Sequence, residues 1–145
     1  MKKLLVLFAV LTSVSAVSFA APGLVSMNKP QALKTISDKT ITTISAVTLN
    51  GKVISDSFTG YFGKDGTANG KLASKPDDGP QDDQGKWMVK SNGMFCITWD
   101  HWNDGKEKCV NFYKLSNALL IMNARHGFES LVLDEQIQSG DQMSG

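Results

Sequence analysis

The chain has 145 residues, of which 41% are hydrophobic, and a formal net charge of +1. This length is typical of one domain that can bury a core of its own. The net charge becomes −1 without Lys2 and Lys3, which belong to a segment that we expect to be removed. A surface so close to neutral does not attract phosphate backbones over long distances, which excludes nucleic acid as an expected partner.

The first residues have the three parts of a secretory signal peptide. Lys2 and Lys3 carry positive charge, residues 4–11 form an apolar run, and Ser18 and Ala20 are small side chains ahead of a cleavage site. The run is shorter than the ~20 apolar residues that cross a bilayer, and no later segment is long enough to do so. We expect residues 1–20 to be cleaved, with a cut after Ala16 as the alternative. Residues 21–145 would then form a single periplasmic or secreted domain without a transmembrane segment.

The expected domain begins with an irregular segment, residues 21–28, that we expect to be mobile. Residues 29–36 predict a short helix, because Pro30 suits a first helical turn and the apolar residues that follow share one face. Strand-like sequence then leads into Asn50-Gly51, which favours a type I′ hairpin turn. The returning strand is expected to bend near residues 55–57 and to continue to residue 62.

A second turn is predicted at Asp65-Gly66, followed by a strand over residues 67–72. Residues 74–85 contain two prolines, two glycines and four aspartates, a composition typical of an exposed loop. Hard divalent cations bind several oxygen ligands, so the four aspartates are weak candidates for a metal site. The solvated loop is the favoured interpretation, because the aspartates lack the alternating spacing of a helix–loop–helix calcium site. These candidates are Asp77, Asp78, Asp82 and Asp83.

The two cysteines lie in strands whose apolar residues alternate with polar ones. If Cys96 lies opposite Cys109, Phe95 lies opposite Val110, so the apolar side chains share one face and the sulfur atoms the other. A tight turn at residues 104–105 would separate the cysteines, so we expect a wider loop over residues 100–105. In an oxidising compartment this pair predicts a disulfide worth about 3 kcal/mol. A metal-binding pair and free thiols are the alternatives.

Two further strands are expected near the C-terminus, over residues 115–122 and 131–137, with a turn at Arg125-His126-Gly127 between them. Residues 140–145 form a polar tail that we expect to be mobile. With the earlier segments this gives about seven to eight short strands and one short helix. The prediction is therefore an all-β domain, a small antiparallel barrel or sandwich with one disulfide hairpin.

Several turn glycines, tryptophans and the cysteine pair occur in a recognisable order. The residues concerned are Tyr61-Phe62-Gly63-Lys64-Asp65-Gly66-Thr67, Gly85-Lys86-Trp87, Gly93, Cys96, Trp99 and Cys109. In this order the chain resembles a family of small exported bacterial proteins that is catalogued only as a domain of unknown function. The resemblance implies a periplasmic or secreted β domain, and it implies no activity. A weaker likeness is to exported inhibitor barrels that pair a G-x-W strand with one disulfide.

The densest group of polar and aromatic residues is predicted at one hairpin tip, with Trp99, Asp100, His101 and Trp102. Exposed aromatic rings at a loop tip are typical anchors for a binding partner. His101 beside Asp100 or Glu107 could also act as an acid or base. In the simpler interpretation Trp99 belongs to the core and the rest is a plain turn.

These features favour an exported, non-enzymatic binding or interaction domain whose partner is a protein, an envelope glycan or a small apolar ligand. The alternatives are a small secreted hydrolase that uses His101 with Asp100 or Glu107, and a divalent-metal-binding module. Because no nucleophile motif or phosphate-binding loop occurs, we predict no catalytic residue and no cofactor. An open apolar mouth would favour ligand binding, whereas a filled barrel would favour recognition at the surface.

Overall fold

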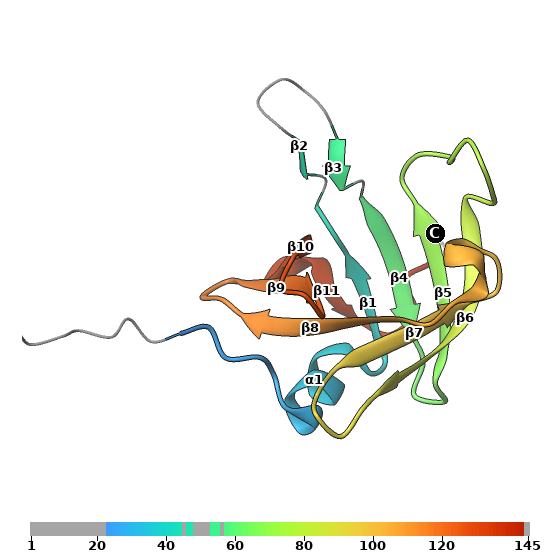
Figure 1. The fold of residues 1–145 in the computed structure, drawn as a ribbon. Coiled ribbons are helices and arrows are strands. Elements are labelled where there is room, and N and C mark those ends of the chain that lie inside the picture. The colour runs from blue at the N-terminus through green and yellow to red at the C-terminus, as the bar shows by residue number, and fades with distance from the viewer. Residues whose placement is uncertain (1–22, 45, 48–52, 56, 144–145) are drawn as a thin grey trace, which may run out of the picture.

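The computed structural model describes residues 23–44, 46–47, 53–55 and 57–143. These residues form a nearly closed antiparallel β-barrel with one α-helix below it (Figure 1). The elements in chain order are α1 (Lys29–Ile36), β1 (Lys39–Thr42), β2 (Ala46–Val47), β3 (Val53–Ser55), β4 (Phe58–Phe62), β5 (Thr67–Leu72), β6 (Asp82–Val89), β7 (Phe95–Trp99), η1 (Trp102–Gly105), β8 (Lys108–Lys114), β9 (Ala118–Asn123), β10 (Phe128–Leu133), η2 (Asp134–Gln136) and β11 (Ile137–Ser139). The signal peptide predicted for residues 1–20 lies outside the described residues.

The described strands of the barrel form one nine-stranded sheet in the order β10-β9-β8-β7-β6-β5-β4-β1-β11. Each strand from β4 to β10 pairs with its sequence neighbour, so the chain runs up and down around the wall. The wall is completed where Ile44 N donates a 2.9 Å hydrogen bond to Leu131 O of β10. The all-β prediction is confirmed, and the structure selects the barrel over the sandwich.

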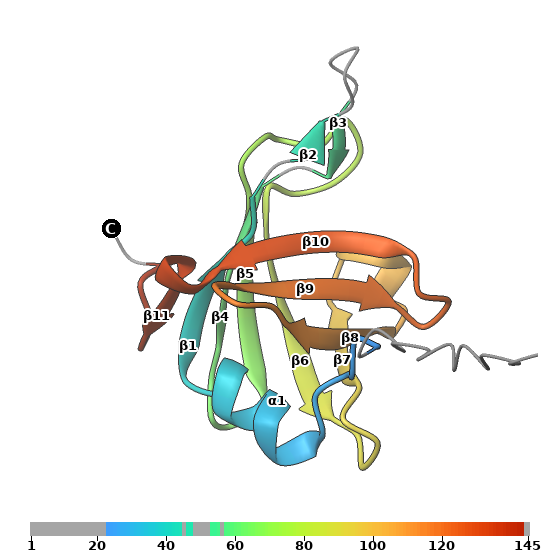
Figure 2. The ribbon, with the colours of Figure 1, turned by 90° about the vertical axis from the view of Figure 1, so that its left-hand side faces the viewer.

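Helix α1 lies across one end of the barrel (Figure 2). Asn28 caps it reciprocally: its side chain accepts from Gln31 N, and Gln31 Oε1 accepts from Asn28 N. Ala32 and Ile36 on its inner face are buried in the core. The predicted helix bounds are confirmed, and α1 closes this end because its apolar face packs on the inward side chains of the strands.

The disulfide hairpin forms in the predicted register. Cys96 of β7 pairs with Cys109 of β8, and Phe95 pairs with Val110. Phe95 and Val110 are buried inside the barrel, so the cysteines project from the opposite face of the same two strands. The wide loop expected after residue 99 is also present, because η1 occupies residues 102–105.

Two expectations about strand boundaries were wrong. The described residues form nine strands in the barrel sheet, where about seven to eight were expected, and β2 and β3 pair separately as a hairpin that projects from the end opposite α1 (Figure 2). The expected strand over residues 131–137 is interrupted, because η2 turns the chain so that β11 can pair with β1. The loop expected over residues 74–85 ends earlier, because β6 begins at Asp82. The predicted turn at Asn50-Gly51 lies outside the described residues.

Candidate functional site

The interior of the barrel holds a cavity of about 450 Å³. It extends from Ile36 of α1 towards the opposite end, where the polar side chains of Asn103, Lys108 and Glu129 reach solvent. Most of the lining is aliphatic or aromatic, and the rings come from Phe58, Phe62, Phe95, Trp99, Trp102 and Phe112. An apolar cavity of this size lies within the range of about 300–1,000 Å³ that is typical of small-molecule sites.

Strand periodicity explains why these side chains face the interior. In β7 the odd-numbered residues Phe95, Ile97 and Trp99 point inward, and in β8 the even-numbered Val110 and Phe112 do so. Lys108, two residues before Val110 at the open end of β8, has the same parity and therefore also faces inward. The inward-facing side chains of β8 are otherwise apolar, and a charged one is expected at the end that reaches water.

An aromatic cluster covers one side of the cavity near its open end. The ring centroids of Trp99 and Trp102 lie 4.8 Å apart, and Phe58 meets both rings edge to face. The rings pack on Gly70, where an added Cβ would lie 2.6 Å from Trp99 Cη2 and 2.7 Å from Trp102 Cζ3. Glycine is thus required at this position because the tryptophan rings occupy the space that a side chain would fill.

The carboxylate of Asp83 holds the loop that carries Trp102. Asp83 is 6% exposed, and its Oδ2 accepts hydrogen bonds from His101 N at 2.9 Å and Trp102 N at 2.7 Å. Its Oδ1 accepts from Gln84 N and contacts His101 Nδ1, each at 2.9 Å. Trp102 Nε1 also donates to Pro80 O at 2.8 Å. One buried acid therefore fixes both the start of η1 and the ring that lines the cavity.

The contacts of Asp83 and His101 shift the pKa values of both residues. Burial raises the pKa of Asp83, but the hydrogen bonds from Trp102, His101 and Gln84 outweigh that effect and hold the pKa below its ordinary value. The hydrogen bond that the His101 ring makes to the Asp83 carboxylate raises the pKa of His101 above its ordinary value. The His101 side chain is 70% exposed, so its imidazole lies at the outer surface of the loop rather than in the cavity.

The structure separates the four residues predicted at the hairpin tip. Trp99 and Trp102 line the cavity, whereas Asp100 and His101 are exposed on the outside. The ring of His101 bonds to Asp83, and neither Asp100 nor Glu107 occupies that position. Glu107 instead forms an ion pair with Lys90, in which Nζ and Oε2 are 2.9 Å apart. The two tryptophans of the predicted group therefore line the cavity, whereas His101 contacts Asp83, the residue that holds the loop.

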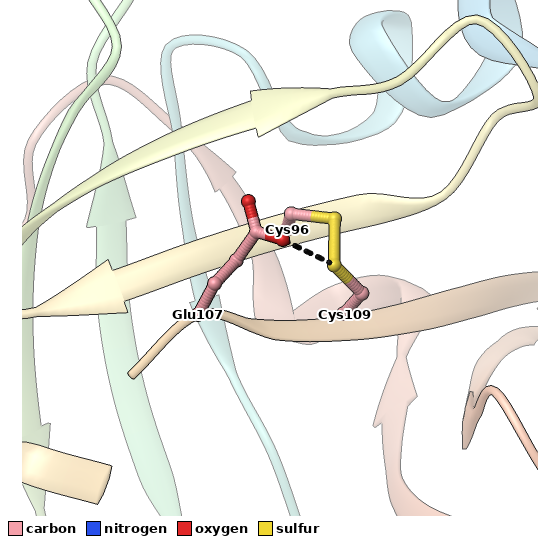
Figure 3. Close-up of side chains that lie close together, drawn as sticks. All are labelled: Cys96, Glu107 and Cys109. Carbon is pink, nitrogen blue, oxygen red and sulfur yellow. Dashed lines mark hydrogen bonds between the residues drawn. A yellow bond between two sulfur atoms is a disulfide. The ribbon is translucent and has the colours of Figure 1, made fainter. Parts of the chain in front are cut away.

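Glu107 also lies beside the disulfide, on the outer face of β7 and β8 (Figure 3). Its Oε2 is 3.3 Å from Cys109 Sγ, a contact that cannot be a hydrogen bond in the disulfide because that sulfur carries no hydrogen. In the described part of the chain, Cys96, Glu107 and Cys109 are the group whose potential metal-ligand atoms lie together. Because both sulfurs are bonded to each other, they are not available as thiolate ligands.

The four candidate aspartates are divided between two elements. Asp77 and Asp78 lie in the exposed loop after β5, whereas Asp82 and Asp83 belong to β6. The carboxylate of Asp83 is occupied by backbone N–H groups and His101. This arrangement gives Asp83 a structural role in supporting η1.

Several cavity residues near the open end were missed in the sequence. Thr43, Lys108, Glu129 and Ser130 all line the cavity. The parity of β8 signals Lys108, and Ser130 has the parity of the buried Val132 in β10. Glu129 reaches the lining because of a bulge between Phe128 and Ser130, where the pairing of β10 with β9 shifts. Nothing in the local sequence marks that bulge.

Comparisons with known proteins give no further constraint: no model of a protein family, no curated protein and no solved structure matches the chain. Among the residues described, no helix has both the length and the apolar character needed to cross a membrane. Function is therefore inferred from the geometry of this chain's own residues.

Proposed function

We propose that this protein is an exported, non-enzymatic binding protein that holds a small apolar ligand inside its β-barrel. The observation that carries the proposal is the apolar cavity of about 450 Å³ that reaches the solvent-accessible side chains of Asn103, Lys108 and Glu129. Burial of apolar surface is worth about 25 cal/mol per Å², so a ligand that fills such a cavity gains affinity without any charged contact. The Cys96–Cys109 disulfide supports export, because such bonds persist in oxidising compartments.

The rigidity of the wall supports the same function. Each of the wall strands β4 to β10 is paired with its sequence neighbour, and the disulfide joins β7 to β8, which pair over three residues, on the outer face. A preformed cavity loses little conformational entropy when a ligand enters, which favours binding. The interior offers apolar contact in place of a set of convergent acids, bases and nucleophiles, so we propose binding rather than catalysis.

The proposal is tested with N-phenyl-naphthylamine, an uncharged dye whose fluorescence increases in apolar surroundings. We expect the wild-type protein to bind the dye and to show changed tryptophan emission, because Trp99 and Trp102 line the cavity. The variant Ile121→Trp fills the cavity from β9 and should weaken binding by roughly tenfold, equivalent to 1.4 kcal/mol.

The matched control is Met122→Trp, which places the same ring on the next residue of β9, where alternation directs it to the outer face. We expect this variant to bind the dye as the wild type does. A wild-type protein that does not bind the dye, or equal loss of binding in both variants, would overturn the proposal.

A further inference from the structure

Ser130, a residue of the cavity lining, carries a buried hydroxyl group without a hydrogen-bond partner in the described part of the chain. Ser130 of β10 is 8% exposed and lines the cavity, and among the described residues its Oγ is the buried side-chain oxygen or nitrogen that makes no hydrogen bond. Leaving such a group unsatisfied costs about 1–3 kcal/mol, and buried polar groups in native proteins are rarely left so. A hydrogen-bonding group on the ligand would remove this cost.

The bulge in β10 brings a charged residue to the cavity beside Ser130. Phe128 pairs with Met122 and Ser130 pairs with Ile121, so Glu129 is an extra residue between the two pairs. As a result Glu129 and Ser130, although adjacent in sequence, both line the cavity. Ser130 therefore lies next to the charged residues at the open end and far along the barrel from Ile36 of α1.

The charges at the open end balance each other. Lys108 Nζ lies 2.5 Å from Glu129 Oε2, and Asn123 Nδ2 donates to Glu129 Oε1 at 3.2 Å. Lys108 is the one cationic residue in the cavity lining, and this ion pair already engages its charge. A ligand carboxylate near Ser130 would lose its hydration and meet the negative charge of Glu129, which is costly for a buried anion.

The size of the cavity limits the apolar part of the ligand. Its volume is about three times the roughly 150 Å³ of a dry protein cavity that accommodates benzene. The rest of the inward surface from Ser130 towards α1 is aliphatic or aromatic, including Ile41, Leu119 and Phe112. The cavity therefore fits a ligand with an apolar body and one polar end, the polar end lying near the open end of the barrel.

We propose that the ligand is an uncharged, lipid-like molecule with one hydrogen-bonding oxygen, a hydroxyl or carbonyl, that bonds to Ser130 Oγ while its apolar body fills the barrel. This inference rests on the proposed function, since it assumes that the cavity binds an apolar ligand. Ser130 provides the specificity, because its hydroxyl can donate to a carbonyl or hydroxyl oxygen and accept from a hydroxyl group.

The test uses three probes of equal chain length, n-octane, n-octanol and octanoate, which compete with the fluorescent dye. The ratio of the octanol affinity to the octane affinity is measured in the wild type and in Ser130→Ala, so that the differing hydrophobicities of the probes cancel. We expect the ratio to fall about tenfold in the variant, as for loss of one buried hydrogen bond. Ser91→Ala, in the exposed turn after β6, should leave the ratio unchanged.

A second variant tests the exclusion of charge. In the wild type we expect octanoate to bind at least tenfold more weakly than octanol. Glu129→Gln removes the negative charge and frees Lys108, so it should raise the affinity for octanoate relative to that for octanol. Thermal unfolding checks that each variant is folded, and Ser130→Ala should unfold at or above the wild-type temperature because it removes an unsatisfied hydroxyl group.

The outcomes separate the two proposals. If the dye and the probes bind but the octanol-to-octane ratio is the same in wild type and Ser130→Ala, the role of Ser130 is refuted and the binding function stands. If octanoate binds the wild type as tightly as octanol does, the uncharged ligand class is refuted. If neither the dye nor any probe binds, the binding function itself is refuted.

Discussion

The two ends of the barrel are built from the same strands, yet one is closely packed and the other contains a cavity. At the end where α1 lies, protein packs on protein: Ala32 and Ile36 of the helix are almost completely buried against the inward-facing side chains of the strands. At the opposite end the inward rows finish in Ser130, Lys108 and Glu129 around a cavity. The difference indicates that one end contributes more packing to stability, whereas the other leaves a space that we propose a ligand fills.

The comparison predicts unequal costs for truncation to alanine at the two ends. Ile36→Ala removes a side chain of α1 that is 1% exposed and should lower the free energy of unfolding by about 2–5 kcal/mol. Leu72→Ala removes a partly exposed side chain that lines the cavity at the open end, and should cost about 1 kcal/mol. Urea unfolding of both variants measures the difference. Equal losses would mean that the open end is packed as tightly as the end beneath α1.

The disulfide stabilises the wall without belonging to either end. Replacing both cysteines, Cys96→Ser with Cys109→Ser, should lower the free energy of unfolding by about 3 kcal/mol, because the unfolded chain gains conformational freedom. Dye binding by the folded variant should be unchanged, since the sulfurs lie on the outer face. Loss of dye binding at a temperature where the variant remains folded would show that the cavity depends on the disulfide.

The aromatic side of the open end is sensitive to added volume. Gly70→Ala places a Cβ within 3 Å of Trp99, Trp102 and Phe58, and should destabilise the fold by about 1–3 kcal/mol. Because the rings must move, tryptophan emission should shift as well. Gly23→Ala is the control, since nothing lies within 4 Å of its added Cβ. Unchanged emission and stability in Gly70→Ala would contradict the packing described for this side.

The smallest expected effect is a pH dependence at the loop that carries Trp102. The raised pKa of His101 means that its pairing with Asp83 contributes stability that is fully present below about pH 6.5. That contribution is lost as the pH rises through the raised pKa of the folded state. The unfolding temperatures of wild type and His101→Gln should therefore converge between about pH 5 and pH 8. A difference that widened with pH would contradict the assigned contact.

The predicted features that the structure confirms depend on short-range patterns. The register of β7 and β8 follows from the alternation of Phe95, Cys96 and Val110 within one hairpin, and α1 follows from Pro30 and its apolar face. Features that depend on distant contacts were missed. The composition around Asp83 indicated a loop, but its carboxylate accepts from backbone N–H groups 18 and 19 residues further along the chain.

The missed part of the cavity has the same cause. Ser130 precedes the strand expected over residues 131–137, and its place in the cavity lining appears only when β10 pairs with β9 and the barrel forms. An exposed anchor was one of the interpretations offered for Trp102 at the hairpin tip, and in the structure its ring packs on Gly70 and lines the cavity. Sequence alternation thus reveals which residues face inward, but not where the inward space remains unfilled.

The most direct test of the binding function is NMR spectroscopy of the methyl groups during titration with n-octanol. We predict that the methyl resonances of Ile41, Ile97, Leu119 and Ile121 shift and show nuclear Overhauser effects to the octanol chain, because these residues line the cavity. The methyl group of Met88, which is exposed on β6, should not respond. Contacts of octanol with Met88 or other outward residues alone, with the inward methyl groups unchanged, would contradict the account.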